Sequence, residues 1–202
     1  MSPRDPTTPL VIACAALARE LKAVLPDPVE VRYLPAPLHN RPERIAPAIE
    51  AILTDVDTER RVLIGYGDCG TAGGLDHLLE RFPNARRLPG DHCYSFLAGA
   101  DLFDALSDDE LGTFYLTDFL ARHFDAIVWR AYRLDTRPEL IGMLFGNYTR
   151  VVHLAQSDDP SVDAKARAAA DALGLDFGRV EIGTDPLHRE VAVGLGLTAP
   201  VP

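Results

Sequence analysis

The stretch VLIGYGDCGTAGG, residues 62–74, joins a short apolar run to a glycine-rich turn. The run from Val62 to Tyr66 has the pattern of a buried β-strand, and the apolar residues between Leu75 and Phe82 repeat at helical spacing. A buried strand that passes through a tight turn into an amphipathic helix is typical of the βαβ units of a parallel sheet. This stretch therefore predicts an α/β fold.

The same alternation occurs elsewhere in the chain. Strand-like runs lie at 10–13, 29–34 and 151–155, and Ile45 to Val56 has the apolar spacing of a second crossover helix. We expect an open, mostly parallel, Rossmann-like sheet with crossover helices. A further alanine-rich helix from Asp163 to Leu173 is expected to end at Gly174.

The middle of the chain has a different pattern. Residues 111–124 are apolar at most positions, which predicts a largely buried helix, and residues 127–129 predict a short strand. Pro138 marks the start of another helix. Because no clear linker separates these segments, we expect a single α/β domain over 10–197, with two lobes as an alternative. Residues 1–9 are expected to be disordered.

Composition excludes several classes of function. The chain has 202 residues, of which 47 % are hydrophobic and 25 % charged, as in a typical globular protein. Its net charge of −10 argues against binding to nucleic acid or to an anionic membrane surface. The polar, proline-rich start has no signal-peptide pattern, and no apolar run reaches the ~20 residues that span a bilayer. We expect a cytoplasmic protein with reduced thiols.

The three cysteines, Cys14, Cys69 and Cys93, each lie at or just past the end of a segment with the pattern of a buried strand. In a parallel α/β sheet ligands bind beyond the carboxyl ends of the strands, so the three thiols are expected to converge there. Thiolates hold zinc or, alternatively, a [4Fe–4S] cluster. The simpler interpretation is packing, because free cysteine is often buried as a small apolar residue and no CxxC motif is present.

The glycine-rich turn offers a second set of binding groups. Gly67, Asp68, Gly70 and Gly73 are candidate cofactor-binding residues, because backbone N–H groups at a helix N-terminus favour an anion. The same groups are expected to lower the pKa of the Cys69 thiol. The turn matches neither GxGxxG nor a phosphate-binding Walker loop, and a tight strand-to-helix turn explains its glycines equally well.

Two histidines and one aspartate complete the candidate site. His92 is a possible fourth metal ligand or proton donor, with Asp91 orienting it, and His39 follows the second strand at the same sheet edge. Adjacent residues of an extended chain point to opposite sides, so His92 and Cys93 face one metal only if the chain turns there. His39 is equally consistent with an ordinary loop residue.

Taken together, several motifs resemble the domain-of-unknown-function family 1638 of bacteria and archaea. The resemblance covers most of the chain after residue 9. It is carried by Cys14 and by the segments 65–70, 91–93, 112–117 and 146–148. Members of this family look like companions of corrinoid-dependent methyltransferase systems, so the resemblance implies a role near methyl transfer from cobalamin. The Asp-x-His-x-x-Gly signature of a cobalamin-binding domain is absent from this sequence.

The leading hypothesis is a metal-thiolate enzyme of corrinoid-linked methyl transfer or one-carbon metabolism that acts on a small molecule. Zinc bound by three thiolates keeps a fourth position open for a thiol or water. The alternative is a non-catalytic accessory protein that binds the metal, a corrinoid or a methyltransferase partner.

Overall fold

The computed structural model describes residues 7–197. Of residues 1–9, which were expected to be disordered, residues 1–6 lie outside the described part. The chain divides into two compact units. Unit 1 contains the described residues up to Ala100 together with those from Thr184 onward, and unit 2 contains Asp101–Gly183.

Unit 1 is built on a parallel four-stranded sheet with the order β2-β1-β3-β4. The chain first places β2 on one side of β1 and then crosses back to place β3 on the other side. Open α/β sheets bind ligands in the crevice at such a reversal, which here falls beyond the carboxyl ends of β1 and β3. The strands are β1 (Leu10–Cys14), β2 (Glu30–Leu34), β3 (Val62–Gly65) and β4 (Ala85–Arg87).

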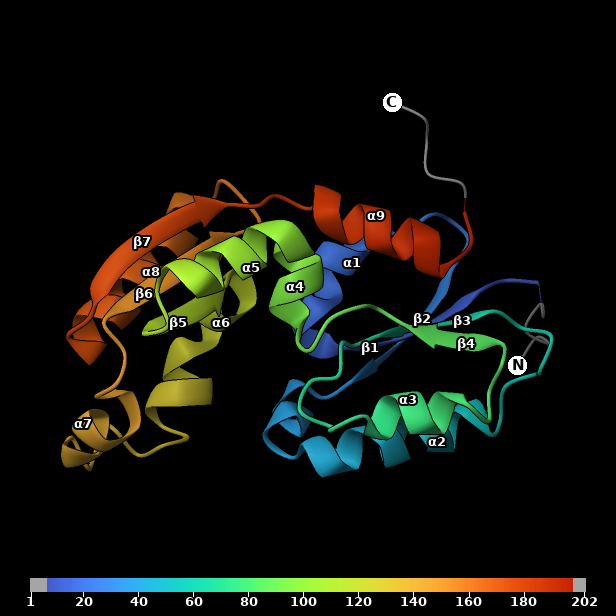
Figure 1. The fold of residues 1–202 in the computed structure, drawn as a ribbon, viewed down its shortest axis with the longest axis horizontal. Coiled ribbons are helices and arrows are strands. Elements are labelled where there is room, and N and C mark those ends of the chain that lie inside the picture. Colours follow the sequence, from blue (N-terminus) through green and yellow to red (C-terminus); the bar gives the residue numbers. More distant parts are fainter. Residues whose placement is uncertain (1–6, 198–202) are drawn as a thin grey trace. The chain divides into compact units, whose positions relative to one another are not determined.

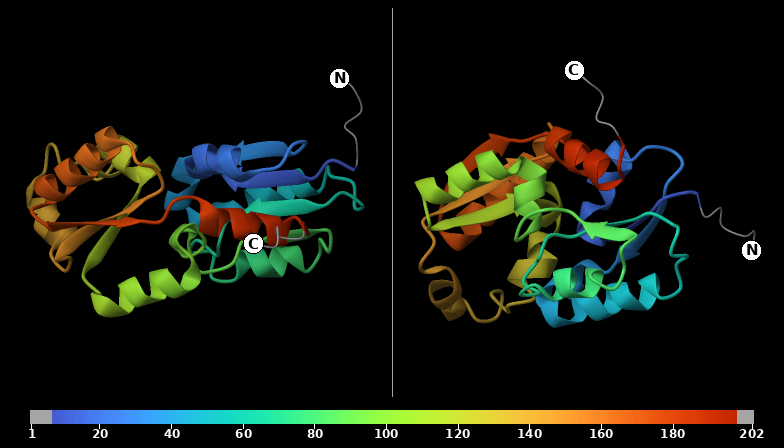
Figure 2. Two further views of the ribbon diagram at one scale, coloured as in Figure 1. Left: turned by 90° about the horizontal axis from the view of Figure 1, so that it is seen from above. Right: turned by 45° about the vertical axis from the view of Figure 1, so that its right-hand side comes forward.

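Helices cover both faces of this sheet, because its central strands β1 and β3 are apolar on both sides (Figure 1). Helices α2 and α3 pack against one face, and α1 and α9 lie on the other (Figure 2). Helix α4 packs against α9. The helices are α1 (Ala18–Val24), α2 (Ile45–Leu53), α3 (Gly74–Leu79), α4 (Cys93–Ala98) and α9 (Asp185–Gly194), with 3-10 turns at Ala15–Leu17, Ala36–Asn40 and Pro42–Arg44.

One glycine allows α9 to approach the sheet closely. A Cβ atom added at Gly194 would lie 2.6 Å from a methyl group of Leu63, which is completely buried in β3. The C-terminal helix is therefore part of the core of unit 1, although unit 2 precedes it in the sequence.

Unit 2 contains a parallel three-stranded sheet with the order β5-β6-β7. Helices α6 and α8 pack together and against the strands, and Phe103 of α5 packs on Tyr115 of β5. The elements are α5 (Ala100–Asp109), β5 (Thr113–Thr117), α6 (Asp118–Phe124), a π-helical turn (Asp125–Trp129), α7 (Glu139–Phe145), β6 (Arg150–Ala155), α8 (Pro160–Leu173) and β7 (Asp176–Glu181).

The α/β fold with mostly parallel strands and crossover helices is confirmed, whereas two local predictions were wrong. Residues 111–124 are not one helix, because Thr113–Thr117 pairs with β6 as a strand and the helix starts only at Asp118. Thr117 ends the strand and caps the helix, since its hydroxyl accepts a hydrogen bond from the Leu120 amide at 3.2 Å. Residues 127–129 belong to the π-helical turn rather than to a strand.

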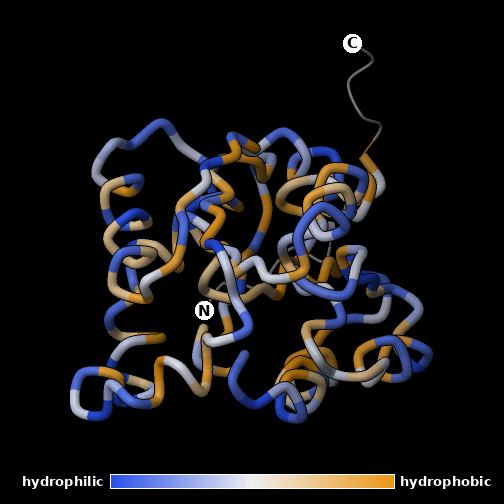
Figure 3. Tube along the Cα trace, turned by 60° about the vertical axis from the view of Figure 1, so that its left-hand side comes forward, coloured by the Kyte–Doolittle hydropathy of each residue, from blue (hydrophilic) through white to orange (hydrophobic). Residues whose placement is uncertain are grey.

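Apolar and polar segments alternate at short intervals along the chain (Figure 3). Within residues 7–197, no helix is both long enough and apolar enough to cross a membrane.

Candidate thiolate metal site

The three cysteines follow three different strands of unit 1. Cys14 is the last residue of β1, Cys69 lies in the turn between β3 and α3, and Cys93 is the first residue of α4, beyond β4. Two backbone hydrogen bonds join the loops after β3 and β4, from the Asp68 amide to the Gly90 carbonyl at 2.9 Å and from the Cys69 amide to the Asp91 carbonyl at 2.7 Å. The strand ends thus bring thiols from distant parts of the sequence to one edge of the sheet.

The loops after β3 and β4 can approach each other closely because glycine residues lie where their backbones meet. A Cβ atom added at Gly67 would lie 2.8 Å from the Gly90 carbonyl oxygen. Gly90 itself has φ +85°, a conformation that favours glycine, and it supplies the turn before His92 and Cys93. Cys69 also has a positive φ of 51°, which is uncommon for a residue with a side chain.

Burial disfavours ionisation of all three thiols, and charge repulsion from a neighbouring cysteine adds to this effect at Cys69 and Cys93. Burial raises the pKa of the Cys69 thiol to about 11, and repulsion from Cys14 contributes. Burial likewise raises the pKa of Cys93, to which repulsion from both other cysteines is added. The pKa of Cys14 is raised by burial as well. The expected lowering of the Cys69 pKa is therefore wrong for the protein without a metal, because burial outweighs the N–H donors.

Backbone N–H groups are nevertheless directed at all three sulfurs. Cys14 accepts from Ala16, Cys69 accepts from Gly67 and Cys93, and Cys93 accepts from Tyr94. These donors favour the thiolate form, which is the form that binds a metal. The bond from the Cys93 amide to the Cys69 sulfur also shows how closely the two segments approach.

The anion-binding capacity of the glycine-rich turn is used by the protein itself. The Asp68 carboxylate accepts hydrogen bonds from the Thr71 hydroxyl at 2.6 Å, the Gly73 amide at 2.8 Å and the Ala72 amide at 3.0 Å. The Thr71 bond, followed by the Gly73 and Ala72 bonds and the Arg87 charge, lowers the pKa of Asp68. Gly70 and Gly73 have positive φ angles that shape this turn. The amide groups of Ala72 and Gly73 are thus occupied by an internal carboxylate.

His92 and His39 lie near each other at the same edge. His92 precedes α4, has an extended backbone and is half-buried. Its ring packs against that of Tyr94, with ring centroids 5.4 Å apart. His39 lies in the turn after β2 and is exposed, yet surrounding protein atoms, followed by the charge of His92, lower its pKa. Asp91 is exposed, and its carbonyl bonds to Cys69. The roles of the three side chains in catalysis or metal binding stay predictions.

Between residues 7 and 197, no group of three or more His, Cys, Asp or Glu side chains is arranged closely enough to hold a metal ion as it stands. The three thiols would have to draw together around an ion. Cys69 and Cys93 lie in a turn and at a helix end, where small adjustments are easier than in β1, which holds Cys14.

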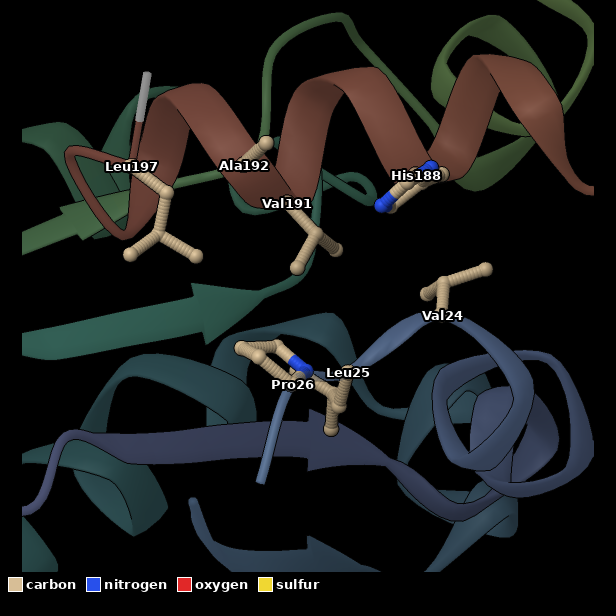
Figure 4. Close-up of a pocket in the computed structure, with 7 residues that line it drawn as sticks. All are labelled: Val24, Leu25, Pro26, His188, Val191, Ala192 and Leu197. Carbon is tan, nitrogen blue, oxygen red and sulfur yellow. The ribbon is translucent and has the colours of Figure 1, made fainter. Parts of the chain in front are cut away.

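A separate hollow of about 280 Å³ lies along α9 (Figure 4). It includes Val24, the last residue of α1, and therefore lies at the edge of the sheet opposite the cysteines. Its lining is apolar apart from His188, and it adds no group to the thiol site. The lining residues are Val24, Leu25, Pro26, His188, Val191, Ala192 and Leu197.

Two groups of residues were not singled out by the sequence patterns. Tyr66 lies next to the thiols, and Asp118 of unit 2 lies in a buried polar network with His153. A tyrosine directly after a buried strand was the available signal for the first. The second has no local signal, because Asp118 and His153 are distant in the sequence and meet only through the pairing of β5 with β6.

The architecture defines an α/β protein with parallel sheets, in which three cysteines follow the strands β1, β3 and β4 in the sequence. The chain belongs to the family described as Protein of unknown function (DUF1638), which matches residues 33–190. Cys69 and Cys93 lie inside the matched region, and Cys14 precedes it. No curated protein and no solved structure matches the chain.

Proposed function

We propose that unit 1 binds a thiophilic metal through Cys14, Cys69 and Cys93, with zinc as the first candidate and a [4Fe–4S] cluster as the second. The observation that carries the proposal is the placement of the three cysteines after β1, β3 and β4, beyond the carboxyl ends of the strands, where α/β sheets bind ligands. Three neighbouring thiols can be buried while they are neutral. A bound cation would let all three ionise, because a coordinating thiol is deprotonated outright.

The N–H groups that point at the sulfurs support this proposal. Backbone donors to metal-bound sulfur are part of the outer shell that orients the ligands and tunes the metal. A cysteine that only fills space in a core needs no such donors. Here they come from segments that the fold holds together independently of any metal, such as the paired loops after β3 and β4.

The reaction that we propose for the loaded site is methyl transfer to a thiol. Zinc with three protein ligands would lower the pKa of a small thiol in its fourth position, which makes that thiol a better methyl acceptor. The resemblance to companions of corrinoid methyltransferases supports a methylated corrinoid as the donor. The Co–CH3 bond would break as the S–CH3 bond forms, and its electron pair would remain on the cobalt of the departing corrinoid. His92 and His39 would then serve as nearby groups for accepting the thiol proton.

A non-catalytic accessory role is the second candidate, and the burial of the site favours it. Cys69 is only 6 % exposed, while Cys14 and Cys93 are half-buried. Such thiols suit a site that stores or stabilises a metal better than one that admits a bulky methyl donor. In this role the chain would bind the metal, a corrinoid or a methyltransferase partner and assist assembly.

Metal analysis and an absorption spectrum of anaerobically purified full-length protein test the proposal. We expect one zinc ion without colour, or a coloured cluster, per chain. Replacement of any one cysteine by serine should abolish stoichiometric metal, since a hard hydroxyl replaces a soft thiolate poorly. Unchanged metal content in all three serine variants, or no metal uptake by the wild type, would refute a shared site.

The variant His92→Ala distinguishes a catalytic site from a structural metal site. If His92 acts only in proton transfer, the variant should keep its metal and lose about 10²–10⁴-fold in rate. If His92 is the fourth ligand, metal and thermal stability should fall together, because the binding energy of a structural metal is also folding energy. His77→Ala is the control, because the His77 side chain is 85 % exposed and has no part in the proposed site. Full metal content without methyl transfer to a thiol in the wild type would favour the accessory role.

A further inference from the structure

The buried tyrosine of the crevice, Tyr66, is a polar side chain that the apolar core alone does not explain. It follows the last residue of β3 and is only 2 % exposed. In the register of β1 with β3, Ala13 lies opposite Gly65, so the next pair is Cys14 and Tyr66. Both belong to the cluster on the α2 and α3 face, to which Cys69 also contributes.

The polar end of Tyr66 lies among the thiols. Its hydroxyl is buried, and no atom of the described residues meets the distance and angle limits of a hydrogen bond to it. The side chains beside it include the thiols of Cys14 and Cys69, which belong to or pack against the same cluster. In turn the hydroxyl helps to stabilise the Cys14 thiolate. The phenol group therefore has one O–H donor available to Cys14.

Burying a hydroxyl without a good partner costs free energy, about 1–3 kcal/mol by the effect of mutations in proteins. Phenylalanine would fill the same space without this cost. A neutral thiol is a weak acceptor, whereas a thiolate is a strong one, so the partner that suits Tyr66 is Cys14 in its ionised form. That form exists when Cys14 binds a cation.

We propose that Tyr66 is a positioning residue of the metal site, whose hydroxyl donates a hydrogen bond to the Cys14 thiolate in the metal-loaded protein. This inference rests on the proposed function and adds a specific residue to it. The bond would orient the Cys14 sulfur toward the ion and hold it ionised at lower pH. It would also withdraw electron density from the sulfur, which leaves the fourth position as the site of nucleophilic reactivity.

Tyr66→Phe tests the inference, with Tyr33→Phe as the matched control. Tyr33 lies on the neighbouring strand β2, where it pairs with Ala13, and its side chain is exposed. Each full-length protein is titrated anaerobically with Co²⁺ as a spectroscopic probe of thiolate ligation. Zn²⁺ is then added in competition with a chelator over a range of pH.

The expected result for Tyr66→Phe is an affinity about 10–100-fold weaker than that of the wild type, as for other outer-shell partners of metal ligands. The onset of binding should move to higher pH, and the cobalt–thiolate charge-transfer band should shift, because the sulfur loses a donor. Without metal, the thermal stability of this variant should be unchanged or higher. Tyr33→Phe should match the wild type in all measurements.

The outcomes distinguish this inference from the function on which it rests. If the wild type binds metal and Tyr66→Phe binds it with the same affinity, pH profile and spectrum, the positioning role is refuted and the metal site stands. If Tyr66→Phe loses binding completely and the wild type shows a phenolate band, Tyr66 is a ligand rather than a hydrogen-bond donor. If the wild type binds neither Co²⁺ nor Zn²⁺ and holds no cluster, both proposals fail.

Discussion

In unit 1 the thiols of Cys14 and Cys69 lie at the carboxyl ends of β1 and β3. In the separate sheet of unit 2, the carboxylate of Asp118 lies at the carboxyl end of β5. Asp118 is 1 % exposed and accepts hydrogen bonds from the Gln156 amide at 3.1 Å and from the Ser157 hydroxyl. His153 Nε2 lies 3.0 Å from the same carboxylate, and Arg122 bonds to it at 3.3 Å. This carboxylate is surrounded by donors.

The two edges differ in the charge state that the protein favours. Burial acts to raise the pKa of Asp118, but the bonds from His153, Ser157 and Gln156 and the Arg122 charge lower it overall. In unit 1 burial prevails and raises the pKa of all three thiols. Unit 2 thus completes its anion with its own groups, which is typical of a structural network. In unit 1 the donors near the sulfurs do not outweigh burial, so the thiols lack the compensation that Asp118 has.

The largest expected effect comes from breaking the completed network with Asp118→Asn. Removing one partner of a buried charged pair costs about 3–5 kcal/mol, so the free energy of unfolding of unit 2 should fall by that amount. The chain has one tryptophan, Trp129 of unit 2, so its fluorescence during denaturation measures this change. Asp158→Asn is the control, because the Asp158 side chain is 82 % exposed and its loss should cost less than about 0.5 kcal/mol.

The same variant should weaken the response of unit 2 to acid. Because the folded pKa of Asp118 is lowered, its stabilisation is present above the unfolded value of about 3.9 and is lost as pH falls through the folded pKa. A variant that loses less than about 1 kcal/mol at neutral pH and keeps the wild-type acid response would show that the two edges do not differ as described.

The second effect is the opposite pH response of unit 1. The Cys69 pKa is raised from 9.0 to about 11, so its contribution to stability is present below about pH 9 and is lost as pH rises toward 11. Two pKa units correspond to about 3 kcal/mol as an order of magnitude. Hydrogen exchange of β1 and β3 without metal measures this loss. Cys69→Ala should reduce it, and bound metal should remove it in the wild type; an alkaline response unchanged in Cys69→Ala would contradict the assignment.

The smallest effect concerns the turn that carries Cys69. Asp68→Asn should lower the free energy of unfolding by about 1 kcal/mol, because a partly exposed carboxylate loses charge-assisted bonds to Ala72 and Gly73. Faster hydrogen exchange of these two amides is the specific measurement. The neighbouring exposed Asp91 provides the control, Asp91→Asn. Equal exchange in both variants would mean that Asp68 does not hold the turn.

Several features of unit 1 were predictable because their causes are local. The apolar run before Cys14 and the strand–turn–helix pattern around Cys69 specify short strands and crossover helices within a few residues. The prediction failed for residues 111–124, where the apolar composition suits a helix as well as a strand. Pairing of β5 with β6 decides that case, and a pairing partner 37 residues away leaves no local pattern.

For the candidate site, the sequence by itself determined that the thiols follow parallel strands, because hydrophobic periodicity and turn glycines are local properties of the chain. Only the tertiary structure decided which groups each thiol meets. It placed Asp68 on the amides of its own turn, Tyr66 beside Cys14, and the Cys93 amide on the Cys69 sulfur. These contacts depend on strand order and on the direction of each side chain. Both are fixed by long-range packing, which sequence spacing does not encode.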